Sequence, residues 1–562
     1  MLHAKGPLLT IDVGDRSVEE TDIDDVLESF IGGRGVATRL AHDRIPYDAD
    51  PLGPENSLLF TTGPLQASQT SFTGRMSATA VSPLTDGLLS SNAGGFMSRN
   101  FADTGYAAVE VAGASDDLVG LHVTDEGVEF ESVPDLAEAT TSEVTEHVEE
   151  TRGLGAEHIA AIGPGGEHQV RFAAIMTTES RAFGRGGLGA VLGSKNVKFL
   201  TFEGDSPPDI EIDQETVADV RRQAATSESP MKDSGTVSVT EYANSVGALP
   251  TRYFQELQFD GAGDIGPTAV AEHKYKKGTC SQCAFACKLP TKDEDSGLVT
   301  EGPEYETVMS FGSNAVNRDF VAIMEANELC DEYGLDTISC GDVVAAYLAS
   351  EDEFGNTDLM HDLVEKIAFR EGVGDTLAEG VDRFADDLGV ENWTMKGMEF
   401  SAHDGRALHG QGLSFATSNR GADHMYGEMY QLEYPLVGPD QALDSEGTLG
   451  KADALVDREN HNAVKDSAVM CKFAFGEVSR EQVSALLDAD YDDLDAVGAR
   501  VVELERYFNN QRGFDRADDD DLPYDLPDLS AALSEYYEAR GWNDDGTVPD
   551  ANVSQGLAPA DD

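Results

Sequence analysis

Residues 277–287 read Lys-Gly-Thr-Cys-Ser-Gln-Cys-Ala-Phe-Ala-Cys, and they place Cys280, Cys283 and Cys287 within eight positions. Soft thiolates at this C-x2-C-x3-C spacing bind either zinc or an iron–sulfur cluster. A structural zinc site normally takes its other ligands from a nearby second pair, and no Cys or His occurs in the thirty residues after Cys287. A four-iron cluster needs four thiolates and accepts one that is distant in the sequence. The spacing therefore favours a [4Fe-4S] cluster over a zinc site.

Three further cysteines, Cys330, Cys340 and Cys471, are candidates for the fourth ligand. Cys330 and Cys340 lie on segments with helical spacing of apolar residues, where a cysteine is usually a buried core thiol. Six cysteines in 562 residues do not make a disulfide framework, so the clustered thiols indicate metal ligands in a reducing compartment. We therefore expect a cytoplasmic protein.

The chain is strongly acidic, because 39 basic and 105 acidic residues give a formal net charge of −66. Such a charge indicates either a binding surface for a polycation or adaptation of the whole protein to molar salt. The acidic residues are spread along the chain rather than gathered in one block, which favours the second explanation. At ~1 M salt the Debye length is only ~3 Å, so the self-repulsion is screened. The composition predicts a halophilic protein that loses its fold in dilute buffer.

Several classes of function are disfavoured by the sequence. A net negative surface repels nucleic acids and anionic membranes, so neither is an expected partner. No stretch approaches the ~18 uninterrupted apolar residues that a transmembrane helix requires. Residues 1–15 lack the apolar core and the small-residue cleavage site of a signal peptide. The length of 562 residues predicts roughly two to four domains.

The secondary-structure signals divide the chain into a β-rich part and a helical part. Residues 1 to about 205 contain short β-branched runs bounded by turn residues, with a hairpin expected around 125–127. From about Pro208 onward, apolar residues recur at three- and four-residue spacing, which is typical of helices. The last fifty residues, with the acidic run 518–521 and the closing Ala-Pro-Ala-Asp-Asp, are expected to form a solvated tail. The sequence shows no internal repeat.

Residues 331–336, Asp-Glu-Tyr-Gly-Leu-Asp, predict a sharp corner between two helices. Gly334 suits the C′ position of the first helix, and Asp336 suits the N-cap of the second. This corner has two interpretations. It is either a helix junction with an acidic cap, or a pair of carboxylates, Asp331 and Asp336, that accept hydrogen bonds from an aminopyrimidine edge.

On these residues the sequence resembles the tungsten-containing aldehyde:ferredoxin oxidoreductase family, which carries Asp-x-x-Gly-Leu-(Asp/Cys) twice. Residues 331–336 match the first copy in full, and residues 466–471 keep the Asp and the Cys but have Val469-Met470 in place of Gly-Leu. In the family, each copy holds one half of a bis-pterin cofactor, and the second copy ends in the fourth cluster cysteine. The resemblance therefore implies that Cys471 completes the cluster of the cysteine triplet.

The resemblance extends over nearly the whole chain. Six further segments look like family motifs in the right order: Gly32-Gly33-Arg34-Gly35, Thr73-Gly74-Arg75, Ser91-Asn92-Ala93-Gly94-Gly95, the arginine–glycine loop 181–189, residues 301–306 and residues 420–424. The family's fold is then expected here. It is an α+β fold with a β-rich N-terminal pterin-binding domain (1–207) followed by two mainly α-helical domains (208–415 and 416–562).

The resemblance also implies the cofactors and the residues that bind them. A tungsten (or molybdenum) bis-pterin is planar at its rings and anionic at its phosphates, which Mg²⁺ bridges. Glycine loops bring backbone N–H groups to such phosphates, and arginines supply positive charge. Dithiolene sulfurs hold either metal, so tungsten and molybdenum stay alternatives. The implied cofactor-binding residues are Arg75, Asn92, Gly94, Arg181, Ala182, Gly184, Asp331, Leu335, Asp336, Asp466 and Met470.

The reaction implied by the resemblance is oxidation of a small aldehyde to the carboxylic acid, with electrons passing singly through the cluster to ferredoxin. Glu306 and His424 lie in the segments that look like the family's active-site motifs, and they are the candidate general acid/base groups. Glu304 is the alternative to Glu306. Glu325 looks like a position that binds a metal at the dimer axis in some members, which implies a homodimer.

Three other interpretations stay open. A family member can catalyse another two-electron reaction, such as reduction of a carboxylate or of an aromatic thioester. A non-enzymatic acidic scaffold with a structural metal knot would explain the cysteine triplet, but neither the carboxylate corners nor the loop 181–189. Gly184-x-Gly186-x-x-Gly189 also fits a dinucleotide-binding fingerprint. The apolar run 171–176 ends eight residues earlier and no clear βαβ unit is present, so a nicotinamide site is disfavoured.

Overall fold

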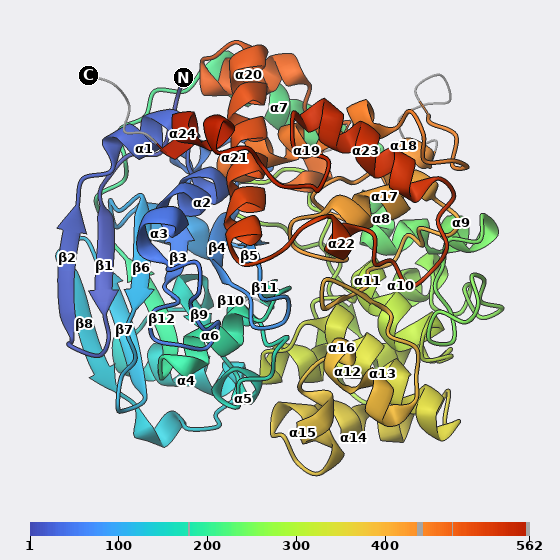
Figure 1. The fold of residues 1–562 in the computed structure, drawn as a ribbon. Helices are drawn as coiled ribbons and strands as arrows, with labels where there is room; N and C mark the ends of the chain where they lie inside the picture. Colours follow the sequence, from blue (N-terminus) through green and yellow to red (C-terminus); the bar gives the residue numbers. More distant parts are fainter. Residues whose placement is uncertain (178–179, 435–441, 475, 558–562) are drawn as a thin grey trace.

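The computed structural model describes residues 1–177, 180–434, 442–474 and 476–557. Figure 1 shows a β-rich part, formed by the first two hundred residues, beside an assembly of helices formed by the rest. The predicted fold class, a β-rich N-terminal domain followed by mostly helical domains, is confirmed. The domain limits at 207 and 415 stay predictions. Among the described residues, no helix combines the length and the apolar character needed to cross a membrane.

The first sheet has six strands, of which β1 and β6 run parallel and the other neighbours antiparallel. Its order is β2 (Ser17–Thr21), β1 (Leu8–Asp12), β6 (Ala108–Ala112), β3 (Leu58–Thr61), β4 (Met76–Val81) and β5 (Leu88–Ala93). Strands β3 and β4 are buried along their whole length. Helix α2 (Gly33–Arg44) packs on both of them. The interior position of these strands explains their short apolar and small side chains.

The second sheet contains the next six strands. Its order is β8 (Gly127–Ser132), β7 (Val119–Thr124), β12 (Val197–Glu203), β9 (Ile159–Ala161), β10 (Ile175–Thr177) and β11 (Arg181–Phe183). Strands β7 and β12 run parallel, and the other neighbours run antiparallel. Strands β7 and β8 form the predicted hairpin, with Thr124 opposite Gly127.

The two sheets repeat one strand arrangement, although the sequence shows no internal repeat. Each strand of the first sheet has the same neighbours and directions as the strand numbered six higher in the second. The loops after β3 and β9 also correspond, because Gly63-Pro64 begins a short helix in one and Gly163-Pro164 begins one in the other. The dipeptide Gly-Pro is common in turns, so by itself it does not indicate a repeat.

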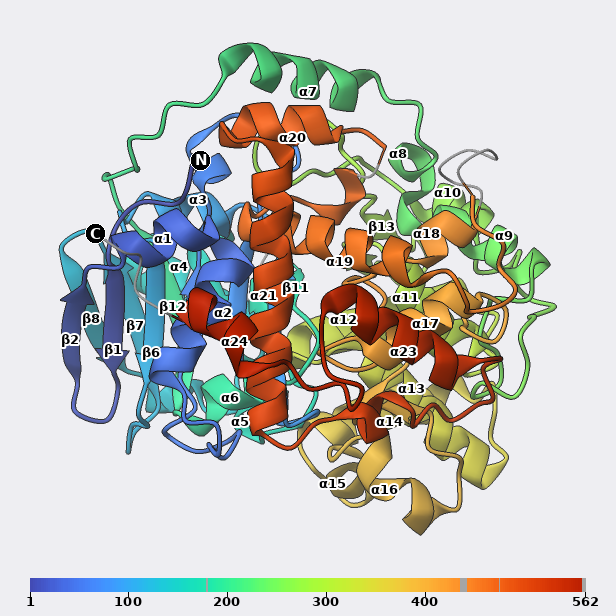
Figure 2. The ribbon, with the colours of Figure 1, turned by 45° about the horizontal axis from the view of Figure 1, so that its top comes forward.

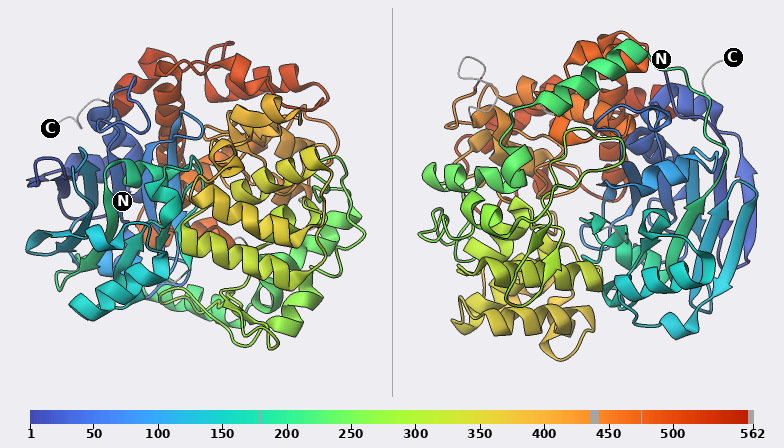
Figure 3. Two further views of the ribbon diagram at one scale, coloured as in Figure 1. Left: turned by 90° about the horizontal axis from the view of Figure 1, so that it is seen from below. Right: turned by 180° about the vertical axis from the view of Figure 1, so that it is seen from behind.

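Most of the helical part lies next to the edge of the two sheets formed by β5 and β11 (Figure 1). Apolar residues at helical spacing form α12 (Phe320–Tyr333), α13 (Thr337–Glu351) and α14 (Thr357–Ala368), within the part of the chain predicted to be helical. Helix α19 (Ala452–Ser467) packs against α21 (Tyr491–Gln511) and also against α2 of the N-terminal part. Figure 2 shows α21 beside α2, and Figure 3 shows the same division of the molecule from below and from behind. Because α2 packs on the first sheet, its contacts with α19 and α21 join the C-terminal helices to that sheet.

The last fifty residues, as far as they are described, are folded and do not form the expected solvated tail. They contain α23 (Leu529–Arg540) and α24 (Asp550–Leu557), which pack on α19 and α21. Asp519, in the acidic run, is fully buried between Arg506, which donates to it at 2.9 and 2.7 Å, and Lys396 at 2.7 Å. The acidic run looks solvated in the sequence, because its partners Arg506 and Lys396 reach Asp519 only in the folded chain. The closing residues 558–562 lie outside the described residues.

Replacing Asp519 by asparagine is expected to lower the free energy of unfolding by about 3–5 kcal/mol, because two buried cations lose their compensating charge. Asp520→Asn is a matched control at an exposed neighbouring position, and its effect should stay below about 0.5 kcal/mol. Denaturant unfolding of both variants in molar KCl measures the difference. Equal stabilities would show that this ion cluster does not hold the C-terminal segment.

Candidate active site

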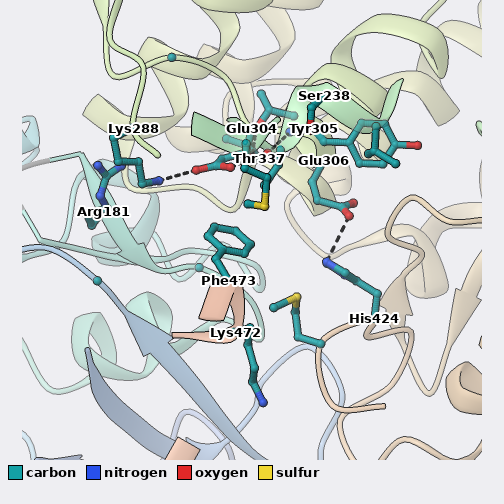
Figure 4. Close-up of a pocket in the computed structure, with 18 of the residues that line it drawn as sticks. Arg181, Ser238, Lys288, Glu304, Tyr305, Glu306, Thr337, His424, Lys472 and Phe473 are labelled. Atoms are coloured by element: carbon teal, nitrogen blue, oxygen red, sulfur yellow. Dashed lines mark hydrogen bonds and ion pairs between the residues drawn. The ribbon is translucent and has the colours of Figure 1, made fainter. Parts of the chain in front are cut away.

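A cavity of about 1020 Å³ lies between the N-terminal strands and the helical assembly. Its walls come from both sheets, the cysteine loop, the corner between α12 and α13, and the segment around His424. Figure 4 shows a part of these walls. Twelve of the seventeen predicted site residues line the cavity: Arg75, Asn92, Gly94, Arg181, Ala182, Gly184, Cys280, Glu306, Asp331, Leu335, Asp336 and His424.

The first carboxylate corner forms as predicted. Helix α12 ends where Gly334 takes a left-handed φ of 69°, and Asp336 caps α13 by accepting hydrogen bonds from two amides of its first turn, each at 3.2 Å. The helix-junction interpretation therefore holds, and Asp331 and Asp336 also line the cavity. Burial raises the pKa of Asp331 to about 7, and the nearby Glu328 adds to this rise. Asp331 can therefore carry a proton near neutral pH.

The second corner has the same backbone turn, although Val469-Met470 replaces Gly-Leu. The amide of Met470 donates to the carbonyl oxygen of Lys465 at 2.7 Å, and the equivalent amide of the first corner does the same at 2.8 Å. Val469 takes the left-handed conformation of Gly334, with a φ of 56°. This conformation costs a non-glycine residue about 1–3 kcal/mol, so the surrounding contacts must hold it. The departure from the family motif leaves the turn intact.

Each corner is attached to one half of the sheet repeat. The amide of Asp336 donates to the carbonyl oxygen of Phe172 at 3.1 Å, and the amide of Cys471 donates to that of Phe72 at 2.6 Å. Asp336 and Cys471 are therefore equivalent in position. The cavity has two corresponding sides, one with a carboxylate and one with a thiol at the matching point.

The two Gly-Pro loops make the close approach between sheets and corners. A Cβ atom on Gly163 would lie 2.4 Å from the carbonyl carbon of Tyr333, and one on Gly63 would lie 2.9 Å from a methyl group of Val469. Only glycine has no Cβ, so both positions require it for this packing. The repeat thus explains two glycines that the sequence motifs did not include.

Asp466 and Met470, which the resemblance assigned to cofactor binding, lie behind the cavity wall. The Asp466 carboxylate accepts hydrogen bonds from Arg34 at 3.2 Å, from Lys472 at 2.9 Å and from Asn92 at 2.9 Å. Through the last of these bonds it positions a residue that does line the cavity. Met470 is fully buried. The part of both residues in cofactor binding stays a proposal.

The four predicted cluster cysteines come together at one end of the cavity. Cys280 lines it, and Cys283, Cys287 and Cys471 are half-buried nearby. Burial raises the pKa of Cys283, and the charges of Cys471 and Cys280 raise it further, as they also do for Cys287. A Cβ on Gly94 would lie 3.3 Å from Sγ of Cys280. Four neighbouring thiols from two distant segments fit an iron–sulfur cluster.

A single-metal site makes a stricter geometric demand than a cluster does. Within the described ranges, no three Cys, His, Asp or Glu side chains converge closely enough to hold one metal ion. In a four-iron cube each thiolate binds a different iron atom, so the sulfurs need not converge on one point. The donor set is therefore compatible with the cluster that the spacing favours. The buried Cys330 and Cys340 agree with their interpretation as core thiols.

The cations of the cavity are balanced by carboxylates and thiols of the chain. Arg181 forms an ion pair with Glu301, and Lys288 forms one with Glu304, as Figure 4 shows for the second pair. Burial would raise the pKa of Glu304, but the charge of Lys288 and the hydrogen bonds from Lys288 and Thr236, with the charge of Arg181, together lower this pKa to about 2. Burial alone would lower the pKa of Arg75, yet two cluster cysteines raise it above its usual value. Arg75 therefore stays protonated beside the thiols.

Glu306 and His424 face each other in the cavity, with Oε1 of the first 3.2 Å from Nε2 of the second (Figure 4). Oε2 of Glu306 accepts a hydrogen bond from the amide of Ala402 at 2.7 Å, which fixes the carboxylate. Nδ1 of His424 is buried and has no hydrogen-bond partner among the described residues. A buried polar atom without a partner costs about 1–3 kcal/mol. Its position at the cavity fits a group or a substrate that binds there.

His403 is a cavity residue that the sequence motifs missed. Its ring stacks on Tyr430, with centroids 3.8 Å apart and planes 6° apart. Nε2 lies 3.9 Å from Oε1 of Glu306, and Nδ1 lies 3.2 Å from the hydroxyl of Tyr434. Burial, followed by the charge of His424, lowers the pKa of His403 well below its usual value, so the ring is neutral. His403 and Glu306 are almost a hundred residues apart in the sequence, so no motif predicted that they would lie close together.

The dinucleotide fingerprint at residues 184–189 is not part of a βαβ unit. Strand β11 leads directly into Gly184, so the expectation that the preceding strand ends eight residues earlier is wrong. This strand pairs antiparallel with β10 at the edge of the sheet, whereas a nucleotide fold requires a parallel strand. Arg185 of the loop donates to the carbonyl oxygen of Ala422 at 2.9 Å. The loop thus joins the second sheet to the segment that carries His424.

Glu325, the residue linked to a dimer metal by the resemblance, lies on α12 with more than half of its side chain exposed. Its carboxylate is 3.5 Å from Nδ1 of His361. His361 follows on α14, the next helix but one, and the sequence alone did not identify it as a neighbour. The dimer metal and the homodimer stay proposals.

A group of thiols that can hold a one-electron cluster, next to an acid/base pair in the same cavity, is the arrangement of a redox enzyme. Family models described as "Aldehyde ferredoxin oxidoreductase, N-terminal domain" and "Aldehyde ferredoxin oxidoreductase, domains 2 & 3" match residues 8–204 and 212–555. The chain belongs to the aldehyde ferredoxin oxidoreductase family, and it is an oxidoreductase.

Curated relatives match this chain over almost its full length. The "Tungsten-containing aldehyde ferredoxin oxidoreductase" of Thermococcus kodakarensis is 34% identical and covers 96% of both chains. The protein of the same description from Pyrococcus furiosus is 33% identical and covers 97% of both. A second Pyrococcus furiosus protein, "Aliphatic sulfonate oxidoreductase, WOR-like subunit", is 27% identical over 99% of this chain and 97% of its own.

A solved structure shares the fold. The active-site complex BamBC of benzoyl coenzyme A reductase, in complex with 1,5-dienoyl-CoA, has a TM-score of 0.80 and covers 99% of this chain and 98% of its own. Its sequence identity is 20%. This similarity supports the α+β fold alone.

Proposed function

We propose that the chain oxidises an aldehyde to the carboxylic acid at a tungsten (or molybdenum) bis-pterin centre and passes the electrons through one [4Fe-4S] cluster to ferredoxin. The observation that carries this proposal is the meeting of cysteines from two distant segments with the Glu306–His424 pair at one cavity. The relatives that bear this activity in their names match 96% and 97% of the chain. Their similarity supports the same chemistry here.

The two corresponding sides of the cavity would each hold one pterin. The cysteine side offers Arg75, Asn92 and Gly94, with Asp466 and Met470 behind them, and the other side offers Arg181, Ala182, Gly184, Asp331, Leu335 and Asp336. Backbone amides of the glycine loops and the protonated Arg75 suit anionic phosphates bridged by Mg²⁺. When bound, the cofactor supplies the two-electron redox chemistry, and the protein supplies binding and proton transfer.

Proton transfer is the task of the chain's own residues. Oxidation of RCHO and H₂O to RCOOH releases two protons and two electrons. Glu306 would accept a proton in the cavity and exchange it with His424, whose Nε2 is 3.2 Å away. The neutral His403, 3.9 Å from Glu306, is a second acceptor, and its contact with Tyr434 leads away from the cavity.

Reduction of a carboxylate or an aromatic thioester is the second candidate function. One relative is described as an aliphatic sulfonate oxidoreductase, and a coenzyme A reductase complex shares the fold. Proteins named for substrates other than aldehydes are therefore similar to this chain. A non-enzymatic scaffold with a metal knot does not account for the Glu306–His424 pair. Assays with an aldehyde and with an aromatic thioester, each coupled to the same dye, distinguish the two enzymatic candidates.

The first test is metal and cofactor analysis of protein prepared anaerobically in molar KCl. The proposal predicts about one tungsten or molybdenum and about four irons per chain, together with a fluorescent pterin after oxidation. An aldehyde should then reduce an artificial dye in the presence of this protein. Zinc as the sole metal, without pterin, would contradict the proposed function and leave a structural knot.

We also propose that the chain is halophilic, as its net charge of −66 indicates. The melting temperature should rise as KCl increases from about 0.2 M to about 3 M, because screening shortens the range over which the acidic side chains repel one another. Thermal unfolding followed by circular dichroism measures this rise. A melting temperature that is independent of KCl would show that the charge serves another purpose.

The setting expected for this activity is the cytoplasm, where the free thiols would stay reduced. The partners we propose are a small aldehyde, ferredoxin and a second copy of the chain. Neither nucleic acid nor a membrane surface suits the negative charge of the protein.

A further inference from the structure

The charge of the segment around the cysteine loop is opposite to that of the chain. Residues 273–292 contain five lysines and no Asp or Glu. With 105 acidic and 39 basic residues in 562, an average stretch of twenty would hold about four acidic residues and one basic residue. A cationic segment is therefore concentrated at the point where the chain supplies three of its cluster cysteines.

Backbone pairing brings part of this segment to the surface. Bridges between Lys274 and Thr291 and between Gly278 and Lys288 close the loop that carries the cysteines. Lys276 and Lys277 are exposed at its outer end. Lys288, in contrast, turns inward to pair with a cavity carboxylate.

Two neighbouring helices add positive charge to the same edge. Arg221 of α7 (Gln214–Thr226) donates to the carbonyl oxygen of Gln69 at 2.8 Å and lies 3.5 Å from Gln282, which is exposed between two cluster cysteines. Lys232 of α8 (Met231–Ser234) lies 5.9 Å from the ring of Phe285, inside the cysteine loop. Both cations thus lie beside residues of the cysteine loop.

These residues define a cluster-edge face: Arg221, Lys232, Lys274, Lys276 and Lys277. Among the described residues, one ion pair is made by this face, between Lys277 and Asp233 at 3.5 Å. Lys232 and Lys274 donate to backbone carbonyl oxygens, which do not neutralise their charge. The other four cations of the face therefore have no carboxylate partner among the described residues.

The cysteines that would hold the cluster are partly exposed next to the cluster-edge face. Cys283, Cys287 and Cys471, like Cys280, are half-buried, and Gln282 beside them is exposed. Cys280 faces the cavity on the inner side. Electron transfer falls steeply with distance, so an acceptor protein must approach the cluster from outside at this edge.

We propose that the cluster-edge face docks an acidic one-electron carrier protein of the ferredoxin type. This inference rests on the proposed function. The remaining acidic surface repels such a carrier, whereas the face attracts it, so charge orients the carrier toward the cysteines. Two oxidised carriers would each accept one electron, which balances the two electrons that each aldehyde oxidation releases. At molar salt the long-range attraction is screened, and short contacts at the face carry the recognition.

The test compares the variant Lys276→Glu/Lys277→Glu with the control Arg16→Glu/Lys366→Glu. The control reverses the same number of charges in the β1–β2 turn and on α14, both away from the cysteine loop. Binding of a purified acidic ferredoxin to the resting protein is measured by calorimetry at the lowest KCl that retains the fold. Aldehyde oxidation is measured with a small artificial dye and with ferredoxin as acceptors.

For the Lys276/Lys277 variant we expect the Kd and the KM for ferredoxin to rise roughly tenfold, because like charges now meet at the contact. Its dye-linked turnover should equal that of the native protein, and the control should match the native protein in every assay. An unchanged ferredoxin Kd in the Lys276/Lys277 variant would overturn the docking proposal. Absence of dye-linked aldehyde oxidation in the native protein would instead overturn the proposed function, while the binding comparison still decides the docking face.

Discussion

Glu306→Gln is expected to lower kcat for aldehyde oxidation by about 10²–10⁴-fold, the usual contribution of a general acid/base, while the metal and iron contents stay at native levels. The amide has nearly the same shape as the carboxylate and can still accept the hydrogen bond from Ala402, seen at 2.7 Å in the native site. It cannot take up a proton beside His424. Steady-state kinetics with a dye acceptor, together with metal analysis of the same preparation, measure both quantities.

The matched control is Glu304→Gln, at the alternative carboxylate two residues away. Glu304 is paired with Lys288 and accepts a hydrogen bond from Thr236 at 2.5 Å. Because the pKa of Glu304 is about 2, its carboxylate stays ionised near neutral pH and is a poor proton carrier there. Its replacement should affect stability more than turnover. The opposite result, an inactive Glu304→Gln and an active Glu306→Gln, would assign the acid/base role to Glu304.

The parts of the site that the sequence predicted are those with local causes. The helix corner at 331–336 follows from Gly334 and from the N-cap Asp336, whose roles depend on a few neighbouring residues. The cysteine triplet is likewise a matter of spacing within one loop. These features were predictable because short-range geometry alone selects their residue types.

The parts that escaped prediction depend on contacts between distant segments. His403 lies beside Glu306 because the segment around Ala402 bonds to that carboxylate, and no motif spacing encodes this contact. The sheet repeat is a matter of strand order rather than of matching residues. Asp519 belongs to an acidic run that looks solvated until its buried partners Arg506 and Lys396 are known.

The positive charge at the cysteine loop is another feature that could not be predicted from the net charge. A value of −66 describes the whole surface, and it gives no sign of a local positive patch that could attract a negative carrier. The folded chain shows that five cations meet at the cysteine loop, and two of them, Arg221 and Lys232, come from outside it. Local charge, and not the net charge, decides how a carrier is oriented at this edge.

Cys471→Ala is expected to reduce the iron content from about four per chain to about three or fewer, since a four-iron cluster uses four thiolates. Ferredoxin-linked turnover should fall by at least about tenfold, because electrons lose their route out of the cavity. The reason lies in the second corner. The amide of Cys471 is held by the carbonyl oxygen of Phe72 at 2.6 Å, which places its thiol among those of the triplet.

Cys340→Ala is the matched control for the loss of a thiol. Cys340 is fully buried on α13, away from the triplet's loop, and its replacement should keep the iron content at the native value. Iron analysis and the low-temperature paramagnetic resonance signal of the reduced protein distinguish the two variants. A native signal in Cys471→Ala would mean that another group completes the cluster. The matching backbone positions of Cys471 and Asp336 would then be a property of the fold, and would not indicate that Cys471 binds iron.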